Sequence, residues 1–61
     1  GLDCYRQIAD NIRGVNFKYL ILEIGINQEV QISKIFEQIN LHLKETIKDL
    51  AGIKRVLVFE K

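Results

Sequence analysis

The fold class of this 61-residue chain is decided by residues 17–25, Phe-Lys-Tyr-Leu-Ile-Leu-Glu-Ile-Gly. The stretch is β-branched and aromatic, and its centre is apolar at successive positions rather than at alternate ones. Such runs are typical of strands covered on both faces, as in the parallel sheets of α/β proteins. Gly25 breaks the run. We therefore expect a strand from Phe17 to Ile24 inside an α/β sheet.

A first helix is expected before this strand, from about Asp3 to Arg13. Its apolar positions recur at three- and four-residue steps and share one face: Leu2, Tyr5, Ile8, Ala9 and Ile12. Asp3 can cap the start or favour its positive dipole end, and Arg13 suits the negative end. Gly14 follows as a natural left-handed terminator.

A second helix is expected after Gly25. Asn27 is a good N-cap, and Glu29 then lies in the first turn, where a negative charge is favourable. The apolar residues expected on its buried face are Val30, Ile32, Ile35, Phe36 and Ile39.

Residues 40–50 allow two interpretations. As a continued helix, they extend an unbroken apolar stripe to Leu50, with no proline or glycine between Asn27 and Gly52 to stop it. As a strand, they begin after a left-handed Asn40. Leu41, Leu43 and Ile47 then face inward, and His42, Lys44, Thr46 and Lys48 face outward. Periodicity alone slightly favours the helix. The last element, Arg55–Phe59, is a strand that follows a turn around Ala51-Gly52.

Composition limits the functions that the chain can perform. One cysteine, Cys4, and one histidine, His42, allow neither an internal disulfide nor a four-ligand metal site. A net charge of +1 without a basic stripe gives no indication of nucleic-acid binding. The apolar runs are far shorter than the ~20 residues that span a bilayer, so no membrane segment is expected and a cytoplasmic location is the default. The 48% apolar content suggests part of a larger core, and the start at Gly1 is consistent with an excised or processed segment.

Individual side chains offer few catalytic candidates. Glu23 is the strongest, because ligands of open α/β sheets gather beyond the carboxyl ends of strands. We nevertheless expect Glu23 and Gln28 to have local structural roles. We expect Cys4 to be a small, partly buried residue of the first turn and His42 to lie on an outer sheet face. The Tyr5-Arg6 pair is expected to contact another part of a parent protein rather than a substrate. The lysines Lys44, Lys48 and Lys54 are expected to form a solvated face.

Three patterns together resemble the C-terminal end of the HemK/PrmC family, which methylates a glutamine side chain in peptide-chain release factors. Residues 1–8, Gly-Leu-Asp-Cys-Tyr-Arg-Gln-Ile, are similar to the family's G-L-D-x-Y-R-x-I. Residues 22–28 contain the counterpart of L-E-I-G-x-x-Q, and residues 48–56 that of K-D-L-A-G-x-x-R-V. Each pattern alone is weak. Their order and spacing, over nearly the whole chain, are fairly specific.

The resemblance implies a place in a Rossmann-like S-adenosylmethionine-dependent methyltransferase sheet of strand order 3-2-1-4-5-7-6, with strand 7 antiparallel. Residues 19–24 would be strand 5, residues 41–48 strand 6, and residues 55–59 strand 7, lying between them. Asn40 stands where the family commonly has glycine. Since asparagine also tolerates the left-handed conformation, the resemblance favours helix then strand over one long helix. Residues 1–61 would then be the C-terminal part of a catalytic domain.

The resemblance also shows which parts this chain lacks. The family uses a glycine-rich turn and an acidic residue for S-adenosylmethionine, and an N-P-P-Y motif for the glutamine amide. The chain has no such turn and no proline. No catalytic, cofactor-binding or metal residue is therefore assigned, and the isolated chain is expected to be inactive toward a release factor. The alternative is an autonomous small α+β module that binds a protein. In the fragment interpretation, strand Tyr19–Ile24 presents an unpaired apolar edge, and self-association through this edge is expected.

Overall fold

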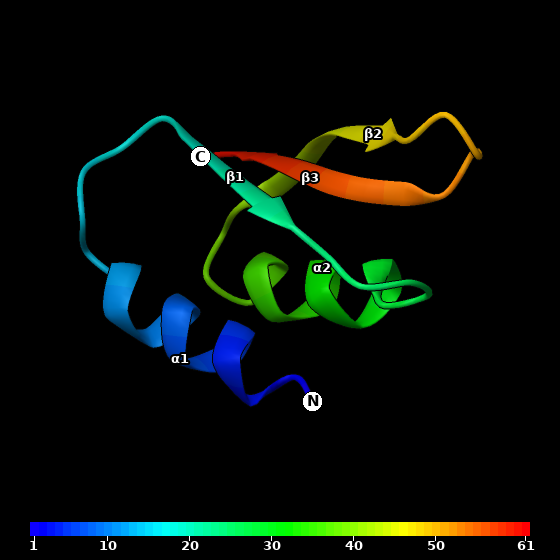
Figure 1. The fold of residues 1–61 in the computed structure, drawn as a ribbon. Coiled ribbons are helices and arrows are strands. Elements are labelled where there is room, and N and C mark those ends of the chain that lie inside the picture. The colour runs from blue at the N-terminus through cyan, green and yellow to red at the C-terminus, as the bar shows by residue number, and fades with distance from the viewer.

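A computed structural model describes all 61 residues as two layers, a three-stranded sheet and two helices that cover one of its faces (Figure 1). In chain order the elements are α1 (Asp3–Ile12), β1 (Tyr19–Glu23), α2 (Glu29–Glu37), β2 (His42–Lys48) and β3 (Lys54–Glu60). The expected order of helix, strand, helix, strand, strand is confirmed. Gly14 has φ of 83° and ends the first helical segment in the left-handed conformation, as predicted.

The sheet has the strand order β1-β3-β2, and β3 is antiparallel to both neighbours. The last strand therefore lies between the two earlier ones. This is the arrangement that the resemblance implies for strands 5, 7 and 6. The register places Leu22 opposite Leu57 on one side of β3, and Thr46 opposite Leu57 on the other.

Asn40 separates α2 from β2. Its φ is 67°, which is the left-handed region, and its backbone amide donates a hydrogen bond of 3.0 Å to the carbonyl of Glu37. The next amide, that of Leu41, donates to the carbonyl of Phe36 at 3.1 Å. These bonds satisfy carbonyls that the end of the helix leaves free, and they turn the chain away from the helix axis. The strand interpretation of residues 41–48 is confirmed, and the long helix is wrong.

The core lies between the helices and the inner face of the sheet. Its fully or nearly fully buried apolar residues are Ala9, Ile24, Ile32, Phe36, Leu41, Leu57 and Phe59. The rings of Phe36 on α2 and Phe59 on β3 are 5.2 Å apart between centroids and tilted by 42°. Such aromatic contacts stabilise a core beyond the area that they bury. α1 contributes the buried Ala9 and four half-buried residues from its predicted face, Leu2, Tyr5, Ile8 and Ile12.

The outer face of the sheet is open, which differs from the expectation that β1 is covered on both sides. Tyr19, Ile21 and Glu23 of β1 are exposed, and the Ile21 side chain is 66% accessible. Val56 and Val58 of β3 are only half-buried on this face. The helices pack against the other face, so within these 61 residues nothing covers the outer one.

A register shift between Leu43 and Glu45 explains one wrong prediction. Strict alternation places both Leu43 and Ile47 inward, but an extra residue in one strand reverses the alternation beyond it. Leu43 lies opposite the buried Phe59, whereas Ile47 lies opposite Val56 and is 44% exposed. Thr46, predicted to face outward, is half-buried instead.

The start of α2 also differs from the prediction. Asn27 is not the N-cap: its φ is 63°, and Gln28 takes that position without a side-chain cap bond. The helix therefore begins at Glu29. Its buried stripe runs through Ile32, Ser33 and Phe36, which leaves Val30 63% exposed instead of in the core.

Candidate functional site

Glu23, the strongest catalytic candidate in the sequence, lies at the carboxyl end of β1. Its side chain is exposed and forms no ion pair. Its backbone carbonyl accepts a hydrogen bond of 3.1 Å from the hydroxyl of Tyr5 on α1. Tyr5 therefore joins the first helix to the end of the strand, which is a structural role within the chain.

Gln28 lies over Gly25 at the start of the second helical segment. A Cβ atom built on Gly25 would lie 3.0 Å from Oε1 of Gln28, which is tighter than ordinary van der Waals contact. Glycine at this position thus makes room for the folded-back glutamine side chain. Gly25 and Gln28 of the second sequence pattern therefore lie close together.

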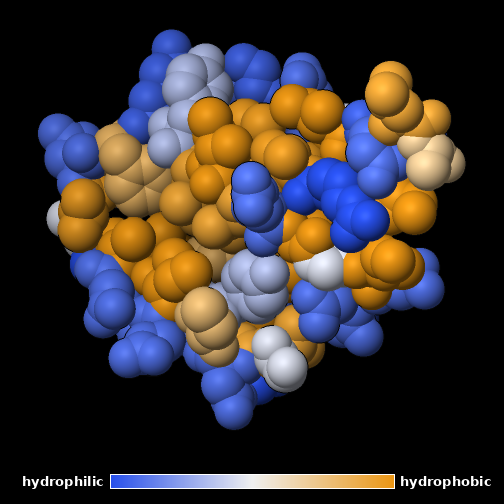
Figure 2. All heavy atoms as spheres, viewed as in Figure 1, coloured by the Kyte–Doolittle hydropathy of each residue, from blue (hydrophilic) through white to orange (hydrophobic).

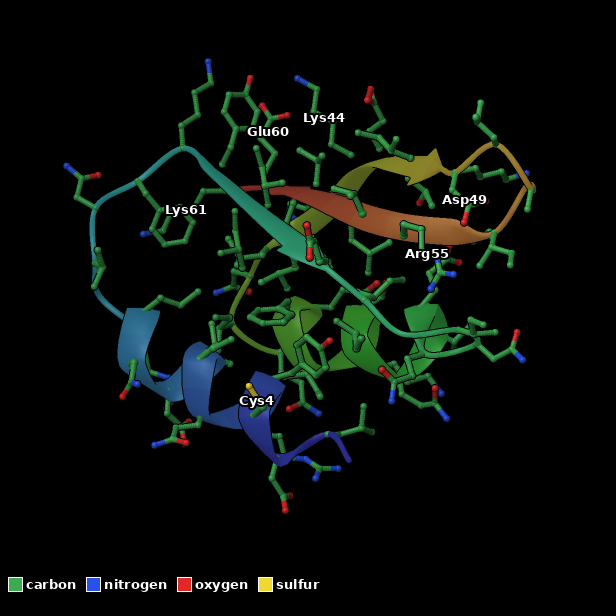
Figure 3. All side chains as sticks on the ribbon, viewed as in Figure 1. Cys4, Lys44, Asp49, Arg55, Glu60 and Lys61 are labelled. Carbon is green, nitrogen blue, oxygen red and sulfur yellow. The ribbon has the colours of Figure 1, made fainter.

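Asp49 organises the hairpin between β2 and β3. Its Oδ1 accepts hydrogen bonds from the backbone amides of Ala51 at 2.9 Å and Ile53 at 3.0 Å, and its Oδ2 pairs with Nε of Arg55 at 3.0 Å (Figure 3). The amide of Ile53, with Arg55 next, stabilises the carboxylate and lowers the pKa of Asp49 below its ordinary 3.8. Gly52 supplies the left-handed conformation that the turn requires, with φ of 82°. The third pattern is therefore a hairpin-forming motif.

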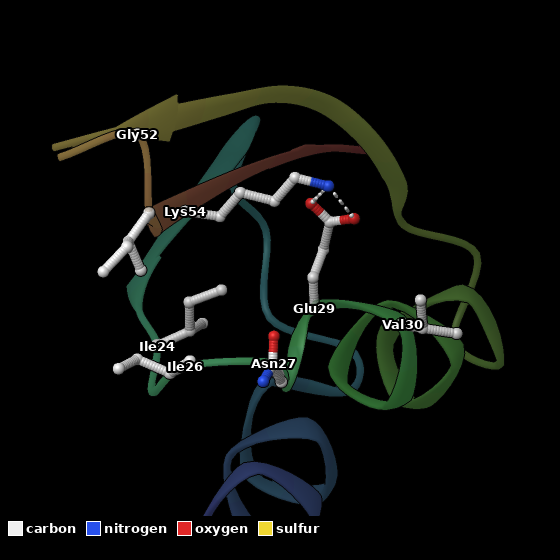
Figure 4. Close-up of a pocket in the computed structure, with 8 residues that line it drawn as sticks. Ile24, Ile26, Asn27, Glu29, Val30, Gly52 and Lys54 are labelled. Atoms are coloured by element: carbon white, nitrogen blue, oxygen red, sulfur yellow. Dashed lines mark hydrogen bonds and ion pairs between the residues drawn. The ribbon is translucent and has the colours of Figure 1, made fainter.

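An open cavity of about 420 Å³ lies between the β1–α2 loop and the beginning of β3 (Figure 4). Its apolar lining comes from Ile24, Ile26, Val30 and Ile53. Across it, Nζ of Lys54 contacts Oε2 of Glu29 at 2.9 Å and Oε1 at 3.0 Å. Glu29 and Lys54 are therefore each other's ion-pair partners at the cavity.

Lys44 joins all three strands on the outer face. Its Nζ lies 3.2 Å from the Tyr19 hydroxyl of β1 and 3.6 Å from the Glu60 carboxylate of β3 (Figure 3). The hydrogen bond with Tyr19, followed by the attraction of Glu60, raises the pKa of Lys44 above 10.5. Lys44, Lys48 and Lys54 are exposed, as expected, and Lys44 and Lys54 also have ion-pair partners.

The remaining candidates are isolated. Cys4 is exposed, and the expectation that it is partly buried is wrong, because α1 turns its apolar face toward the core and Cys4 lies off that face. His42 is exposed, as predicted. No three histidine, cysteine or acidic side chains are grouped so that they could hold a metal ion. Neither helix combines the length and the hydrophobicity that crossing a bilayer requires.

Within these 61 residues, β1 pairs with β3 on one side and has no strand on the other. The amide of Ile24 donates to the carbonyl of Arg55 at 2.8 Å, and the amide of Lys61 donates to the carbonyl of Lys18 at 3.0 Å. In an antiparallel pair, only alternate residues bond across the ladder. Residues 18, 20, 22 and 24 therefore bond to β3, and the amides and carbonyls of Tyr19, Ile21 and Glu23 point to the free edge. Sequence reasoning predicted this edge, but not which residues present it.

The surroundings of this edge are apolar. On the side of the molecule drawn in Figure 1, a broad hydrophobic area covers β1 and the region between it and the helices, broken by a few polar side chains (Figure 2). Half-buried Leu20 and Leu22 of β1 and Phe17 before it belong to the layer that packs on the core. An added strand would thus meet both backbone groups and apolar side chains.

Comparison with curated proteins identifies relatives of one kind. The chain is 35% identical over 63 residues to a release factor glutamine methyltransferase of Thermodesulfovibrio yellowstonii, and 36% identical over 64 residues to one of Fusobacterium nucleatum. It is also 39% identical over 62 residues to a bifunctional methyltransferase of Rickettsia felis. These alignments include 97–100% of this chain. No family model and no solved structure matches it.

The chain spans only 23%, 18% and 12% of the length of these three relatives, respectively. The matched segment is a C-terminal part of each. The full-length coverage of this chain agrees with the three sequence patterns, which extend from Gly1 to Val56. The resemblance is therefore confirmed: the chain is similar to a C-terminal part of release factor glutamine methyltransferases and of a bifunctional methyltransferase.

Proposed function

We propose that the chain is the C-terminal structural portion of an S-adenosylmethionine-dependent protein-(glutamine-N5) methyltransferase that acts on peptide-chain release factors in the cytoplasm. In this proposal β1, β3 and β2 are strands 5, 7 and 6 of a Rossmann-like sheet. The supporting observation is the order β1-β3-β2, in which the last strand lies antiparallel between the earlier two. The names of the relatives support the proposed reaction and substrate.

The role of these residues is to support a site formed elsewhere in the parent protein. The motif residues form internal contacts: Tyr5 with the end of β1, Gln28 with Gly25, and Asp49 with Arg55. A cofactor ribose needs a free acidic group beside a glycine-rich strand-to-helix turn. Glu29, at the cavity, is instead held by Lys54. The residues present do not fit S-adenosylmethionine, so we assign no cofactor-binding, catalytic or metal residue and propose that the isolated chain is inactive.

A chimera tests the proposed place in the parent enzyme. The 61 residues would replace the matching C-terminal segment of the Thermodesulfovibrio yellowstonii relative, and methylation of a release factor glutamine would be followed by the mass of the modified peptide. We expect the chimera to transfer the methyl group, because the exchanged segment only supports the site. A well-folded chimera without activity, beside an active parent, would contradict the proposal.

Calorimetry tests the proposed inactivity of the isolated chain. Titration of S-adenosylmethionine into the 61 residues is expected to give no binding heat. One-to-one binding at micromolar affinity would contradict the proposal, because the chain would then contain a cofactor site of its own. The same titration into the chimera serves as the positive control.

A further inference from the structure

We infer that Tyr5 is a positioning residue for the proposed reaction: its hydroxyl fixes the beginning of α1 against the carboxyl end of β1, the edge at which open α/β sheets bind their ligands. The inference rests on the proposed function and deepens it, because it names one residue of this chain on which the geometry of the parent's site depends. Three observations support it: the direction of α1, the contacts that hold this helix, and the side of β1 that Tyr5 contacts.

The helix α1 runs antiparallel to β1. Tyr5 lies near the beginning of the helix, which starts at Asp3, and its hydroxyl donates a hydrogen bond of 3.1 Å to the carbonyl of Glu23, the last residue of the strand. Figure 1 shows the same arrangement, with the N-terminus on the side of the molecule toward which β1 runs. In the proposed parent, the residues before Gly1 therefore enter the fold at the carboxyl end of β1. Ligands of open α/β sheets bind at this edge.

The Tyr5 hydroxyl forms the one hydrogen bond that joins α1 to another element. The other hydrogen bonds and ion pairs of the helix lie within residues 2–15, among them the pair of Arg6 with Asp3. The beginning of the helix has no side-chain cap bond. Apolar contacts with the core are non-directional, so they hold α1 near the sheet without fixing its position along its own axis. A hydrogen bond is directional, and Tyr5 therefore sets how far α1 extends along β1.

The contact lies on the side of β1 that faces its neighbour in the proposed sheet. The carbonyls of Ile21 and Glu23 point to this side, because the alternate residues bond to β3. In the proposed strand order, strand 4 is the neighbour here. A carbonyl oxygen has two lone pairs, so the Tyr5 hydroxyl and an amide of that strand can both bond to Glu23. Without the hydroxyl, the beginning of α1 and the chain before it would be free to shift relative to both strands.

The chimera tests the consequence for catalysis. Tyr5→Phe is expected to lower kcat for release factor methylation by roughly tenfold or more at unchanged KM, because a misplacement of roughly 1 Å can cost a hundredfold in rate. Tyr19→Phe is the matched control. Tyr19 is the other of the two tyrosines, its hydroxyl accepts a hydrogen bond of 3.2 Å from Lys44, and it lies at the opposite end of β1. We expect Tyr19→Phe to leave kcat unchanged.

Two controls separate positioning from a loss of folded protein. The value of kcat is expressed per S-adenosylmethionine site, counted by calorimetry, so that an unfolded fraction does not lower it. Para-aminophenylalanine in place of Tyr5 keeps a hydrogen-bond donor at the end of the ring, and we expect it to restore most of kcat.

Spin labels on the 61-residue chain measure the position of α1 without any need for activity. One label is attached to Cys4, the only cysteine, which is exposed in the first turn of α1, and the other to Ile26→Cys in the exposed loop after β1. We expect the distribution of distances between them to be broader in Tyr5→Phe than in the wild type or in Tyr19→Phe.

Three results would overturn the inference: the same kcat per cofactor site in Tyr5→Phe and Tyr19→Phe, a spin-label distribution in Tyr5→Phe that matches the wild type, or a loss of kcat that the donor-bearing ring does not restore. The last would show that the hydrogen bond is not the cause. A folded but inactive chimera with Tyr5 intact contradicts the proposed function instead, and the spin labels then still decide whether Tyr5 fixes the beginning of α1. The two proposals therefore fail in distinguishable ways.

Discussion

The two outer strands of the sheet present different edges, although both flank β3. β1 is a regular five-residue strand, Tyr-Leu-Ile-Leu-Glu, which pairs with β3 without a register shift. β2 is a seven-residue strand, His-Leu-Lys-Glu-Thr-Ile-Lys, with two register irregularities and three charged residues. Natural sheets use such irregularities and charges at true edges. The difference indicates that β2 ends its sheet, whereas β1 is built to have a neighbour.

The largest expected loss of stability comes from a substitution in β3, the strand that both outer strands share. Phe59→Ala removes a fully buried ring that packs on Phe36 and lies opposite both Leu20 and Leu43. We expect the free energy of unfolding to fall by about 3–5 kcal/mol, enough to unfold most of a domain of this size. Urea denaturation measures the change. Amide exchange of the variant shows whether β1 or β2 stays folded. If either strand stayed protected, the two outer strands would not depend on one common core.

A pair of proline variants sharpens the description of the β1 edge. Leu22→Pro removes an amide that bonds to β3 and leaves a carbonyl of that strand without its donor, at a cost of about 1–3 kcal/mol beyond Leu22→Ala. Ile21→Pro removes an amide that points to the open edge. Proline is tolerated at such positions, so we expect at most about 1 kcal/mol beyond Ile21→Ala. Equal costs in thermal denaturation would show that the assigned alternation is wrong.

Asp49 tests the hairpin that holds the β2 edge in place. Asp49→Asn keeps one oxygen for the amides of Ala51 and Ile53 but loses the charged pair with Arg55, so a modest decrease in melting temperature is expected; Asp49→Ala should lower it further. The folded pKa of Asp49 is lowered, so the carboxylate stabilises the fold above its ordinary pKa of 3.8 and ceases to do so as the pH falls through the folded pKa. The difference between wild type and Asp49→Asn should therefore shrink in acid. A difference independent of pH would contradict this role.

The smallest effect is expected for Tyr5→Phe. The variant removes the hydroxyl that bonds the Glu23 carbonyl at the open edge, in a partly solvated position. Net contributions of such hydrogen bonds are about 0.5–1.5 kcal/mol, and we expect the lower end because water can replace the hydroxyl. Tyr5→Leu is the control for the loss of the ring. A loss above this range would mean that Tyr5 holds α1 against the sheet more strongly than one bond allows.

Local signals in the sequence were sufficient for every helix and strand except the strand after Asn40. Gly14 and Asn40 both have the left-handed conformation that was expected of them, and the strand after Asn40 follows from it. Periodicity alone favoured a continued helix there. The preference for a strand came from the family resemblance, which supplied the strand order that hydrophobic patterns do not contain.

The wrong predictions arise where strand alternation or helix-capping preference is overridden by the way the chain packs in the folded molecule. The bulge beside Leu43 reverses the orientation of Ile47, and the residue types in positions 42–48 do not indicate that a bulge is present. Asparagine is a common N-cap residue, but Asn27 has a left-handed conformation in the loop, one residue before the actual N-cap, Gln28. A local structural role was expected for Gln28, and its side chain lies close to Gly25. The contacts of Tyr5 and Asp49 could not be derived from the sequence, because each forms only after folding.

Amide exchange of the folded chain tests the difference between the edges most directly. At low micromolar concentration, the amides of Leu20, Leu22 and Ile24 should be protected, and those of Tyr19, Ile21 and Glu23 should exchange rapidly. Rapid exchange at Leu20 and Leu22, with protection at Tyr19 and Ile21 instead, would contradict the assigned alternation.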